Sequence, residues 1–485
     1  MAHGRGSCSI TGMTSKRPHP PRSQPPRGND TRPAQRSDRP ARTPAPAGLP
    51  ARALAVEALD QILTHGAGLE EALDGLSDKL ETRDRALAFH ILATALRRIG
   101  TLRTVLGRLL ERGLPKGSPR LEAVLLVGAT QILYMDVPDH AAVGLSVDVA
   151  RPDRSTAGFA GLVNAVLRRL TREKEQLLEG IDPFMTDTPD WLRTRWTAQW
   201  GEETARAISA MHRVEPPLDI TVKSDPDKWA EALSGTVLPT GTVRVLQAGA
   251  VRNLPGFAEG EWWVQDAAAA LPARLLGDVS GRDVADLCAA PGGKTAQLVQ
   301  AGGRVTALDR SAIRLRRLQE NLDRLNLKAR VLEGDAGAFV GGPFDAILLD
   351  APCTATGTLR RHPDIALTKR PGDIATLAAL QARLLNHAAD LLKPGGVLVY
   401  STCSLEPEEG EEQIERLLKA RKDLRRRPVR AEELARIPDA KTVEAVAAFI
   451  TPQGDVRTLA SHWMFDEAER SGLDGFFAAR LERIP

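Results

Sequence analysis

Two cysteines fifty positions apart, Cys353 and Cys403, are the residues of this chain best suited to covalent chemistry. Each follows a short apolar run, at residues 346–349 and 397–400, that is typical of a buried strand. In a parallel α/β sheet, ligands bind at the carboxyl ends of the strands, so both thiols are predicted to lie at that edge. Because a thiolate is a strong nucleophile near neutral pH, this placement indicates covalent catalysis.

A glycine turn supplies the second candidate site. Residues 284–287 predict a strand that runs into the segment 288–295, with the sequence CAAPGGKT. Its two glycines let the backbone approach a ligand closely, and the helix that follows offers free N–H groups. A P-loop would need a glycine where Cys288 stands, and the dinucleotide motif GxGxxG is absent, so both alternatives are disfavoured. A site for S-adenosylmethionine (SAM) fits the turn best.

Two carboxylates support a SAM site. Asp309 ends a predicted strand at 305–309, where it can accept hydrogen bonds from ribose hydroxyls. Asp335 follows a weaker strand at 331–333, where it can hydrogen-bond near an adenine. Either residue alone could instead cap a helix or close a turn, but their order after the glycine turn favours the cofactor.

Alternating strands and helices are expected to position these groups. Strands are predicted at 284–287, 305–309, 331–333, 346–350 and 397–401, and helices at 295–300, 312–325 and 374–392. This alternation predicts a mostly parallel sheet with helices on both faces, that is, an α/β Rossmann-like domain, which we assign to residues 266–485.

Two folded segments are expected before this domain. Residues 51–175 carry apolar side chains at helical spacing throughout and predict a small all-α bundle. Residues 176–265 predict an α+β connector with a strand at 218–222. Trp196 and Trp200 lie on one face of a predicted helix there; with neighbouring arginines they could stack on bases, but a core face is the preferred interpretation.

The basic segment at residues 1–50 differs from the rest of the chain. It has nine lysines and arginines, two aspartates and ten prolines, so it is predicted to be a disordered tail that either attracts polyanions or has no specific role. No apolar run reaches the ~20 residues that cross a bilayer. The four cysteines show no metal-ligand spacing. We therefore expect a cytoplasmic protein with free thiols, no metal and no membrane segment, and nothing requires more than a monomer.

Several motifs in order resemble the RNA cytosine-5 methyltransferase family NOL1/NOP2/Sun. They are DLCAAPGGKT at 286–295, DAPC at 350–353, RRHPD at 360–364, STCS at 401–404 and DGFFAARL at 474–481. The helical segment resembles the RNA-binding NusB family through the stretch GLVNAVLRR at 161–169. Together they are similar to the Sun/RsmB branch, which modifies a cytosine of small-subunit ribosomal RNA. Residues 354–357 read TATG where that family usually has SGTG, which leaves the cysteine in place.

The resemblance implies a role for each reactive residue. Cys403 attacks C6 of the cytosine, Cys353 assists release of the product, and Asp350 contacts the exocyclic amine or ring N3. Lys294 either lowers a thiol pKa or fixes the loop, unless it only faces solvent. Cys288 is expected to pack or to line the cofactor loop rather than react. The residues expected to bind SAM are Cys288, Ala289, Ala290, Pro291, Gly292, Gly293, Lys294, Asp309, Asp335 and Asp350.

RNA is the partner that follows from this assignment. The target base must leave its stack to reach a site at the sheet edge. Aromatic residues make up only 4% of the chain, so we expect affinity from phosphate contacts by Arg360, Arg361, the connector and the helical bundle. His362 is expected to order a substrate loop. An RNA-binding assembly factor with an inactive methyltransferase domain is the alternative, although the intact thiol pair and glycine turn favour an enzyme.

Overall fold

The computed structural model describes residues 46–74, 80–115, 118–246 and 249–484. The predicted basic tail lies outside the described residues up to position 45. The elements described below belong to one unit of the chain. Among them, no helix is both long and apolar enough to cross a membrane.

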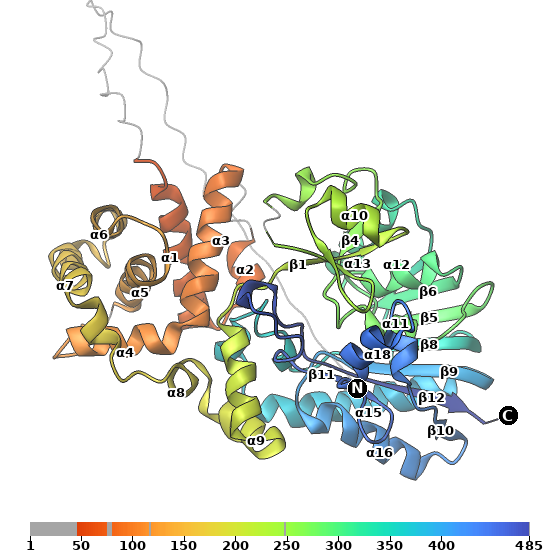
Figure 1. Cartoon of the computed structure of the whole chain (residues 1–485). Coiled ribbons are helices and arrows are strands. Elements are labelled where there is room, and N and C mark those ends of the chain that lie inside the picture. Colours follow the sequence, from red (N-terminus) through yellow and green to blue (C-terminus); the bar gives the residue numbers. More distant parts are fainter. Residues whose placement is uncertain (1–45, 75–79, 116–117, 247–248, 485) are drawn as a thin grey trace, which may run out of the picture. The chain divides into compact units, whose positions relative to one another are not determined.

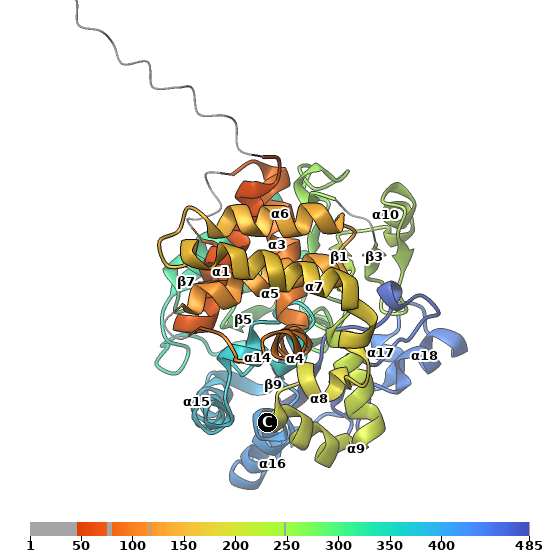
Figure 2. The ribbon, with the colours of Figure 1, turned by 90° about the vertical axis from the view of Figure 1, so that its left-hand side faces the viewer.

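The first part of the described chain is an all-α bundle, as its helical periodicity predicts. Leu59, Ile91 and Leu125 recur on the inner faces of three helices and are fully buried. Figure 2 shows α5, α6 and α7 packed side by side. The helices are α1 (Leu49–His65), α2 (Leu69–Leu73), α3 (Thr82–Arg97), α4 (Ile99–Leu109), α5 (Pro119–Tyr134), α6 (Asp139–Ala150) and α7 (Ala160–Leu178).

The connector begins with two helices, which are followed by a small antiparallel sheet with the strand order β2-β3-β1-β4 and by a third helix between the first two strands. Trp196 is 1% exposed and packs edge-on against His212, and Trp200 belongs to the same apolar cluster, so the predicted core face is confirmed. The elements are α8 (Pro183–Asp187), α9 (Asp190–His212), β1 (Leu218–Val222), α10 (Pro226–Ala232), β2 (Thr236–Val237), β3 (Val243–Val245) and β4 (Trp262–Val264).

The last part is the predicted α/β domain. Its main sheet has the order β10-β12-β9-β8-β5-β6-β7, with β11 paired to β12. The strands from β9 to β7 are parallel, and β12 and β10 are antiparallel additions. The strands are β5 (Asp283–Leu287), β6 (Arg304–Asp309), β7 (Arg330–Glu333), β8 (Phe344–Asp350), β9 (Leu392–Thr402), β10 (Leu424–Arg426), β11 (Val456–Thr458) and β12 (Phe476–Arg483).

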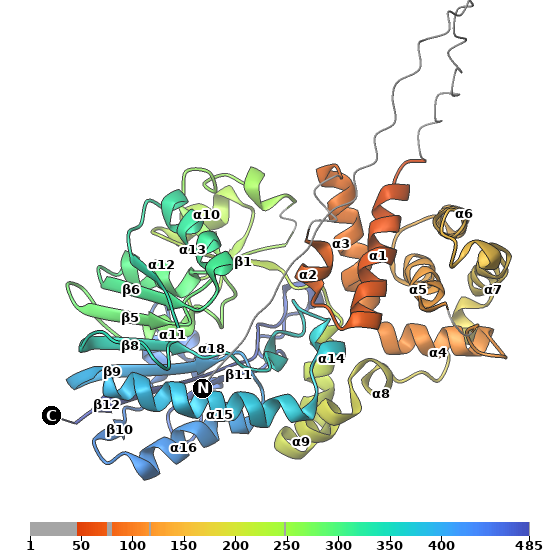
Figure 3. The ribbon, with the colours of Figure 1, turned by 180° about the vertical axis from the view of Figure 1, so that it is seen from behind.

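Helices cover both faces of this sheet (Figures 1 and 3). Along β8, Ala346 and Leu348 face the cluster formed with α11, α12, α17 and α18, while Ile347 and Leu349 face α15 and α16. This alternation buries both faces, as is typical of parallel sheets. The helices are α11 (Leu271–Arg274), α12 (Gly293–Gln300), α13 (Ala312–Arg324), α14 (Ile365–Thr368), α15 (Pro371–Asp390), α16 (Glu411–Ala420), α17 (Ala431–Leu434) and α18 (Ala440–Ala447).

Candidate active site

The two cysteines meet at the carboxyl edge of the sheet. β8 and β9 are adjacent and parallel, with Asp350 opposite Ser401, so the segments after them leave the sheet together. The sulfur atoms of Cys353 and Cys403 are 3.4 Å apart, and both are free thiols. The sequence therefore predicts correctly that both thiols lie at one edge of the sheet.

The environment distinguishes the two thiols. The contact with the Cys403 sulfur, together with burial, raises the pKa of Cys353 well above its usual value, so Cys353 is protonated near neutral pH. Cys403 lines a cavity of about 430 Å³. A protonated thiol thus lies beside a sulfur that faces the cavity.

An ion pair lies beside Cys403 in the same cavity. Lys294 Nζ donates to Asp350 Oδ2 at 2.7 Å, and Ser401 Oγ donates to Asp350 Oδ1 at 2.9 Å. The Lys294 ammonium also lies 4.9 Å from the centre of the Phe476 ring. Lys294 is only 9% exposed, so the alternative in which it merely faces solvent is wrong. Its ammonium bonds to Asp350 and not to a thiol, which favours a role in fixing the loop.

The glycine turn is shaped by its backbone conformation and by its packing against the helix that carries Leu318. Gly292 has a φ of +103°, and a Cβ there would come within 2.8 Å of Leu318 Cγ. Cys288 also has a positive φ, of 65°. Burial raises the pKa of Cys288 to about 12, which agrees with a packed thiol that lines the turn and does not react.

A second cavity, of about 180 Å³, opens between this turn and the next two strands. Cys288, Asp309 and Asp335 line it together with the apolar side chains of Leu380 and Leu384. Carboxylates beside apolar walls suit a ribose and an adenine, so these residues fit SAM. The predicted cofactor residues are therefore divided between this cavity and the larger one, which is lined by Ala289, Ala290, Pro291, Gly292, Gly293, Lys294 and Asp350.

The two carboxylates of the smaller cavity also hold their own loops. Asp309 is 3% exposed and accepts from the backbone N–H groups of Ala290 (3.1 Å) and Ser311 (2.9 Å). Asp335 accepts from the N–H of Gly337 at 2.8 Å and lies 3.4 Å from Arg383. Asp309 and Asp335 thus each stabilise a turn and also line the cavity.

Glu409 is an important residue that sequence reasoning missed. Its fully buried carboxylate accepts from Thr354 N (3.0 Å), Ser404 Oγ (2.6 Å) and Gln381 Nε2 (3.0 Å). Thr354 follows Cys353 and Ser404 follows Cys403, so one side chain ties both cysteine segments together. Burial raises the pKa of Glu409. In the sequence it lies within an acidic run at 406–412 that is typical of an exposed helix start, and nothing there distinguishes it.

The expected phosphate contacts of Arg360 and Arg361 are wrong. Arg360 is 1% exposed. Arg361 donates to Asp266 Oδ2 (2.7 Å) and to Asp474 Oδ2 (3.1 Å). Carboxylates from distant parts of the chain already neutralise Arg361, so the pair anchors its segment inside the protein. His362, the next residue, lines the larger cavity, where a substrate loop was expected.

The bundle and the connector also hold segments of the site. Trp196 Nε1 of α9 donates to Glu406 Oε1 at 3.3 Å, just beyond the Cys403 turn. Arg97, at the end of α3, donates to the carbonyl oxygen of Arg360 at 3.1 Å. Elements far apart in the sequence therefore fix the loops around the thiols.

The sheet, the glycine turn and the two cavities define a SAM-dependent methyltransferase. Residues 273–482 match the model of the family described as 16S rRNA methyltransferase RsmB/F, and residues 49–172 match the NusB family. The chain belongs to the RsmB/F methyltransferase family, with a NusB-type helical domain before the catalytic one. The resemblances to the Sun/RsmB branch and to NusB are thus confirmed.

Curated relatives match most of the chain. A protein of Pseudomonas syringae named ribosomal RNA small subunit methyltransferase B is 37% identical over 454 residues, which cover 89% of this chain and 97% of the relative. A protein of the same name from Klebsiella pneumoniae strain 342 is 37% identical over a match that covers 76% of this chain and 89% of the relative.

Two solved structures share the fold. The crystal structure of PH0851 has a TM-score of 0.67 at 24% identity and covers 90% of this chain and 98% of its own. NSun6 from Pyrococcus horikoshii, solved with SFG, has a TM-score of 0.50 at 22% identity and covers 61% and 98%. At these identities the likeness concerns the fold alone.

Proposed function

We propose that this chain transfers the methyl group of SAM to C5 of a cytosine in small-subunit ribosomal RNA, through a covalent bond between Cys403 and C6 of the base. The observation that carries the proposal is the pair of thiols 3.4 Å apart, one of them lining a cavity beside Lys294 and Asp350. The names of the relatives supply the RNA class. We propose the domain limits 51–175, 176–265 and 266–485 for the bundle, the connector and the catalytic domain.

Cytosine C5 is a poor nucleophile, which is why a thiol is needed. Addition of the Cys403 thiolate to C6 makes C5 enamine-like. When bound, SAM would supply an electrophilic methyl group for that carbon, with S-adenosylhomocysteine as the leaving group. The C5 proton then leaves, and Cys403 is expelled as the C6–S bond breaks.

Cys353 is assigned to the second half of this sequence. Its raised pKa keeps it protonated, so it can donate a hydrogen bond to a thiolate at Cys403, 3.4 Å away. The same position lets it assist release of the product from the adduct.

Lys294 and Asp350 are assigned to binding the cytosine ring and stabilising its charge during addition. A carboxylate at the cavity edge can accept from the exocyclic amine of cytosine. The ammonium 2.7 Å away places positive charge where negative charge develops on the ring during addition. Because Ser401 holds Asp350 and the Lys294 side chain is largely buried, the pair needs little rearrangement when the cytosine enters.

Transfer from labelled SAM to unmethylated small-subunit ribosomal RNA tests the proposal, followed by mapping of the modified position. Wild type should produce 5-methylcytosine, and Cys403→Ala should produce none. A wild-type protein that binds this RNA but transfers no methyl group would instead support the assembly factor. A product at another base position would also refute the cytosine-5 assignment.

A further inference from the structure

A cleft of about 510 Å³ lies between the helical bundle and the connector. Arg97, Arg98 and Tyr134 of the bundle line it, as do Arg213 and Pro217 after α9. This cleft is separate from the two cavities of the active site, and nothing described so far gives it a ligand.

Within the part of the chain that the structure describes, none of the three arginines of this cleft forms an ion pair with a carboxylate. The carboxylate oxygens of the described residues all lie more than 4.0 Å from the guanidinium nitrogens of Arg97, Arg98 and Arg213. The acidic residues nearby are engaged or apart. Asp187 accepts from Thr101 N (2.7 Å) and Thr101 Oγ1 (2.9 Å), and Glu215 pairs with His90 at 3.4 Å. Glu469 also lines the cleft, without an ion pair to any of the three arginines.

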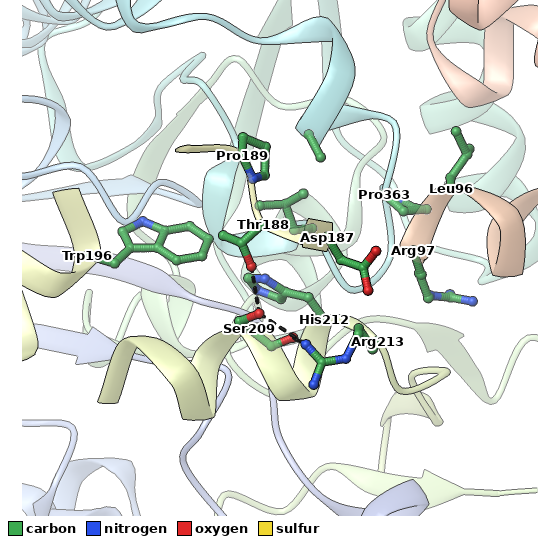
Figure 4. A pocket seen from close by; sticks show the side chains of 12 residues that line it. Leu96, Arg97, Asp187, Thr188, Pro189, Trp196, Ser209, His212, Arg213 and Pro363 are labelled. Carbon is green, nitrogen blue, oxygen red and sulfur yellow. Dashed lines mark hydrogen bonds between the residues drawn. The ribbon is translucent and has the colours of Figure 1, made fainter. Parts of the chain in front are cut away.

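Only part of each guanidinium is used by the protein. Arg98 Nη2 donates to the carbonyl of Arg213 (3.4 Å), and Arg213 Nη1 donates to Ser209 Oγ (3.2 Å). Each arginine has five N–H donors, so most of these remain available. Figure 4 shows a neighbouring pocket that shares Arg97 and Arg213 with this cleft, and in it Arg213 is bonded to Ser209.

These cations are also partly removed from water. Burial lowers the pKa of Arg97 to about 10, and burial also lowers the pKa of Arg213. An unpaired cation at such a site is unfavourable, and a bound anion would offset that cost. The Arg98 guanidinium is stacked 4.3 Å from the centre of the Tyr134 ring, which holds its planar fork in one orientation.

The cleft adjoins the active site. Arg361, which lines the catalytic cavity, donates from Nη1 to the carbonyl of Pro217 at 3.3 Å. Pro217 lines the cleft, so a single hydrogen bond links the walls of the two cavities. Arg97 makes a second link through its bond to the carbonyl of Arg360.

We propose that this cleft binds backbone phosphates of the ribosomal RNA substrate close to the target cytosine, with Arg98 and Arg213 as the main contacts. The inference rests on the proposed function and adds the place where the RNA strand is held. Arginine forks match phosphate oxygens in geometry, and the cleft exceeds the size of a single free phosphate. The link through Pro217 favours an RNA strand that continues into the catalytic cavity.

The test compares full-length variants by fluorescence anisotropy with a labelled, unmethylated small-subunit RNA fragment over a range of salt concentrations. The double variant Arg98→Ala/Arg213→Ala should lose roughly tenfold or more in affinity. The slope of log K plotted against the logarithm of the salt concentration should decrease in magnitude by about 0.7 for each contact to a single-strand phosphate that is lost. Arg98→Lys/Arg213→Lys keeps both charges and should recover most of the salt slope. Arg83→Ala/Arg172→Ala is the matched control, since both are exposed arginines of the same bundle.

The result that overturns the inference is a double alanine variant with the wild-type affinity and salt slope. An affinity loss with an unchanged slope would also overturn it, because it would indicate a purely structural role. Inorganic pyrophosphate serves as the small-anion probe: if the variant loses pyrophosphate binding but binds RNA as wild type does, the cleft is a small-anion site. Methyl transfer, measured on the same samples, separates this outcome from failure of the proposed function, since wild type can bind RNA without modifying it.

Discussion

Replacement of Glu409 by glutamine should impair catalysis without touching either cavity. The buried carboxylate of Glu409 accepts from both cysteine segments, through Thr354 N and Ser404 Oγ. A glutamine of the same size keeps one carbonyl oxygen but turns an NH₂ group toward donors that need an acceptor. The segments that carry Cys353 and Cys403 should then separate.

The size of the effect follows from the hydrogen bonds. A buried donor left unpaired costs about 1–3 kcal/mol, so Glu409→Gln should lower the free energy of unfolding by at least that amount. A misplacement of about 1 Å between reacting groups can lower the rate about 100-fold, and we expect a fall of that order in kcat. The KM for SAM should change little, because Glu409 does not line the smaller cavity.

The same substitution has a signature in pH. Burial raises the pKa of Glu409, so the folded state favours its protonated form. That contribution to stability is present below the unfolded pKa of about 4.3 and is lost as pH rises through the folded value. The difference in the free energy of unfolding between wild type and Glu409→Gln should therefore decrease as pH rises.

Thermal unfolding over a pH series and single-turnover methyl transfer measure these effects. Glu412→Gln, on an exposed position of the same acidic run, is the control and should match wild type in both assays. Wild-type turnover in Glu409→Gln, together with an unchanged unfolding midpoint, would refute the reasoning.

Two further substitutions test the parts that position the site. Gly292→Ala should raise the KM for SAM more than it changes kcat, because the new Cβ would meet Leu318 Cγ at 2.8 Å at a φ of +103° and displace the turn that lines the larger cavity. An unchanged KM, measured at varied SAM concentration, would contradict this role of the turn. Trp196→Ala should destabilise the protein by about 3–5 kcal/mol, the usual cost for a buried tryptophan. It should also lower kcat through the lost bond to Glu406, and chemical denaturation that gives a loss below about 1 kcal/mol would contradict this packing role.

The sequence predicts the parallel strands well because their apolar runs are local signals. The predicted strand at 397–401 is nevertheless longer in the structure, where β9 begins at Leu392. Residues 393–396 read KPGG, a helix-ending signal, yet Phe344 pairs with Leu392 across the sheet and extends the strand. Such pairing depends on a neighbouring strand and not on local propensity.

The same limit explains which site residues were found. The thiols and the glycine turn follow predicted strands directly, so their positions could be predicted. The partners of Arg361, Asp266 and Asp474, lie 95 and 113 positions away in the sequence, so the burial of Arg361 could not be predicted. Glu409 likewise gains its role only through contacts that the fold brings together.

The most direct test of the central claim is to look for a covalent protein–RNA adduct in three variants. Cys353→Ala, incubated with SAM and unmethylated small-subunit RNA, should accumulate an adduct that resists denaturing electrophoresis and whose peptide mass places the RNA on Cys403. Cys403→Ala and the double variant should form none. An adduct in Cys403→Ala, with none in Cys353→Ala, would contradict the account by assigning the attack to the other sulfur.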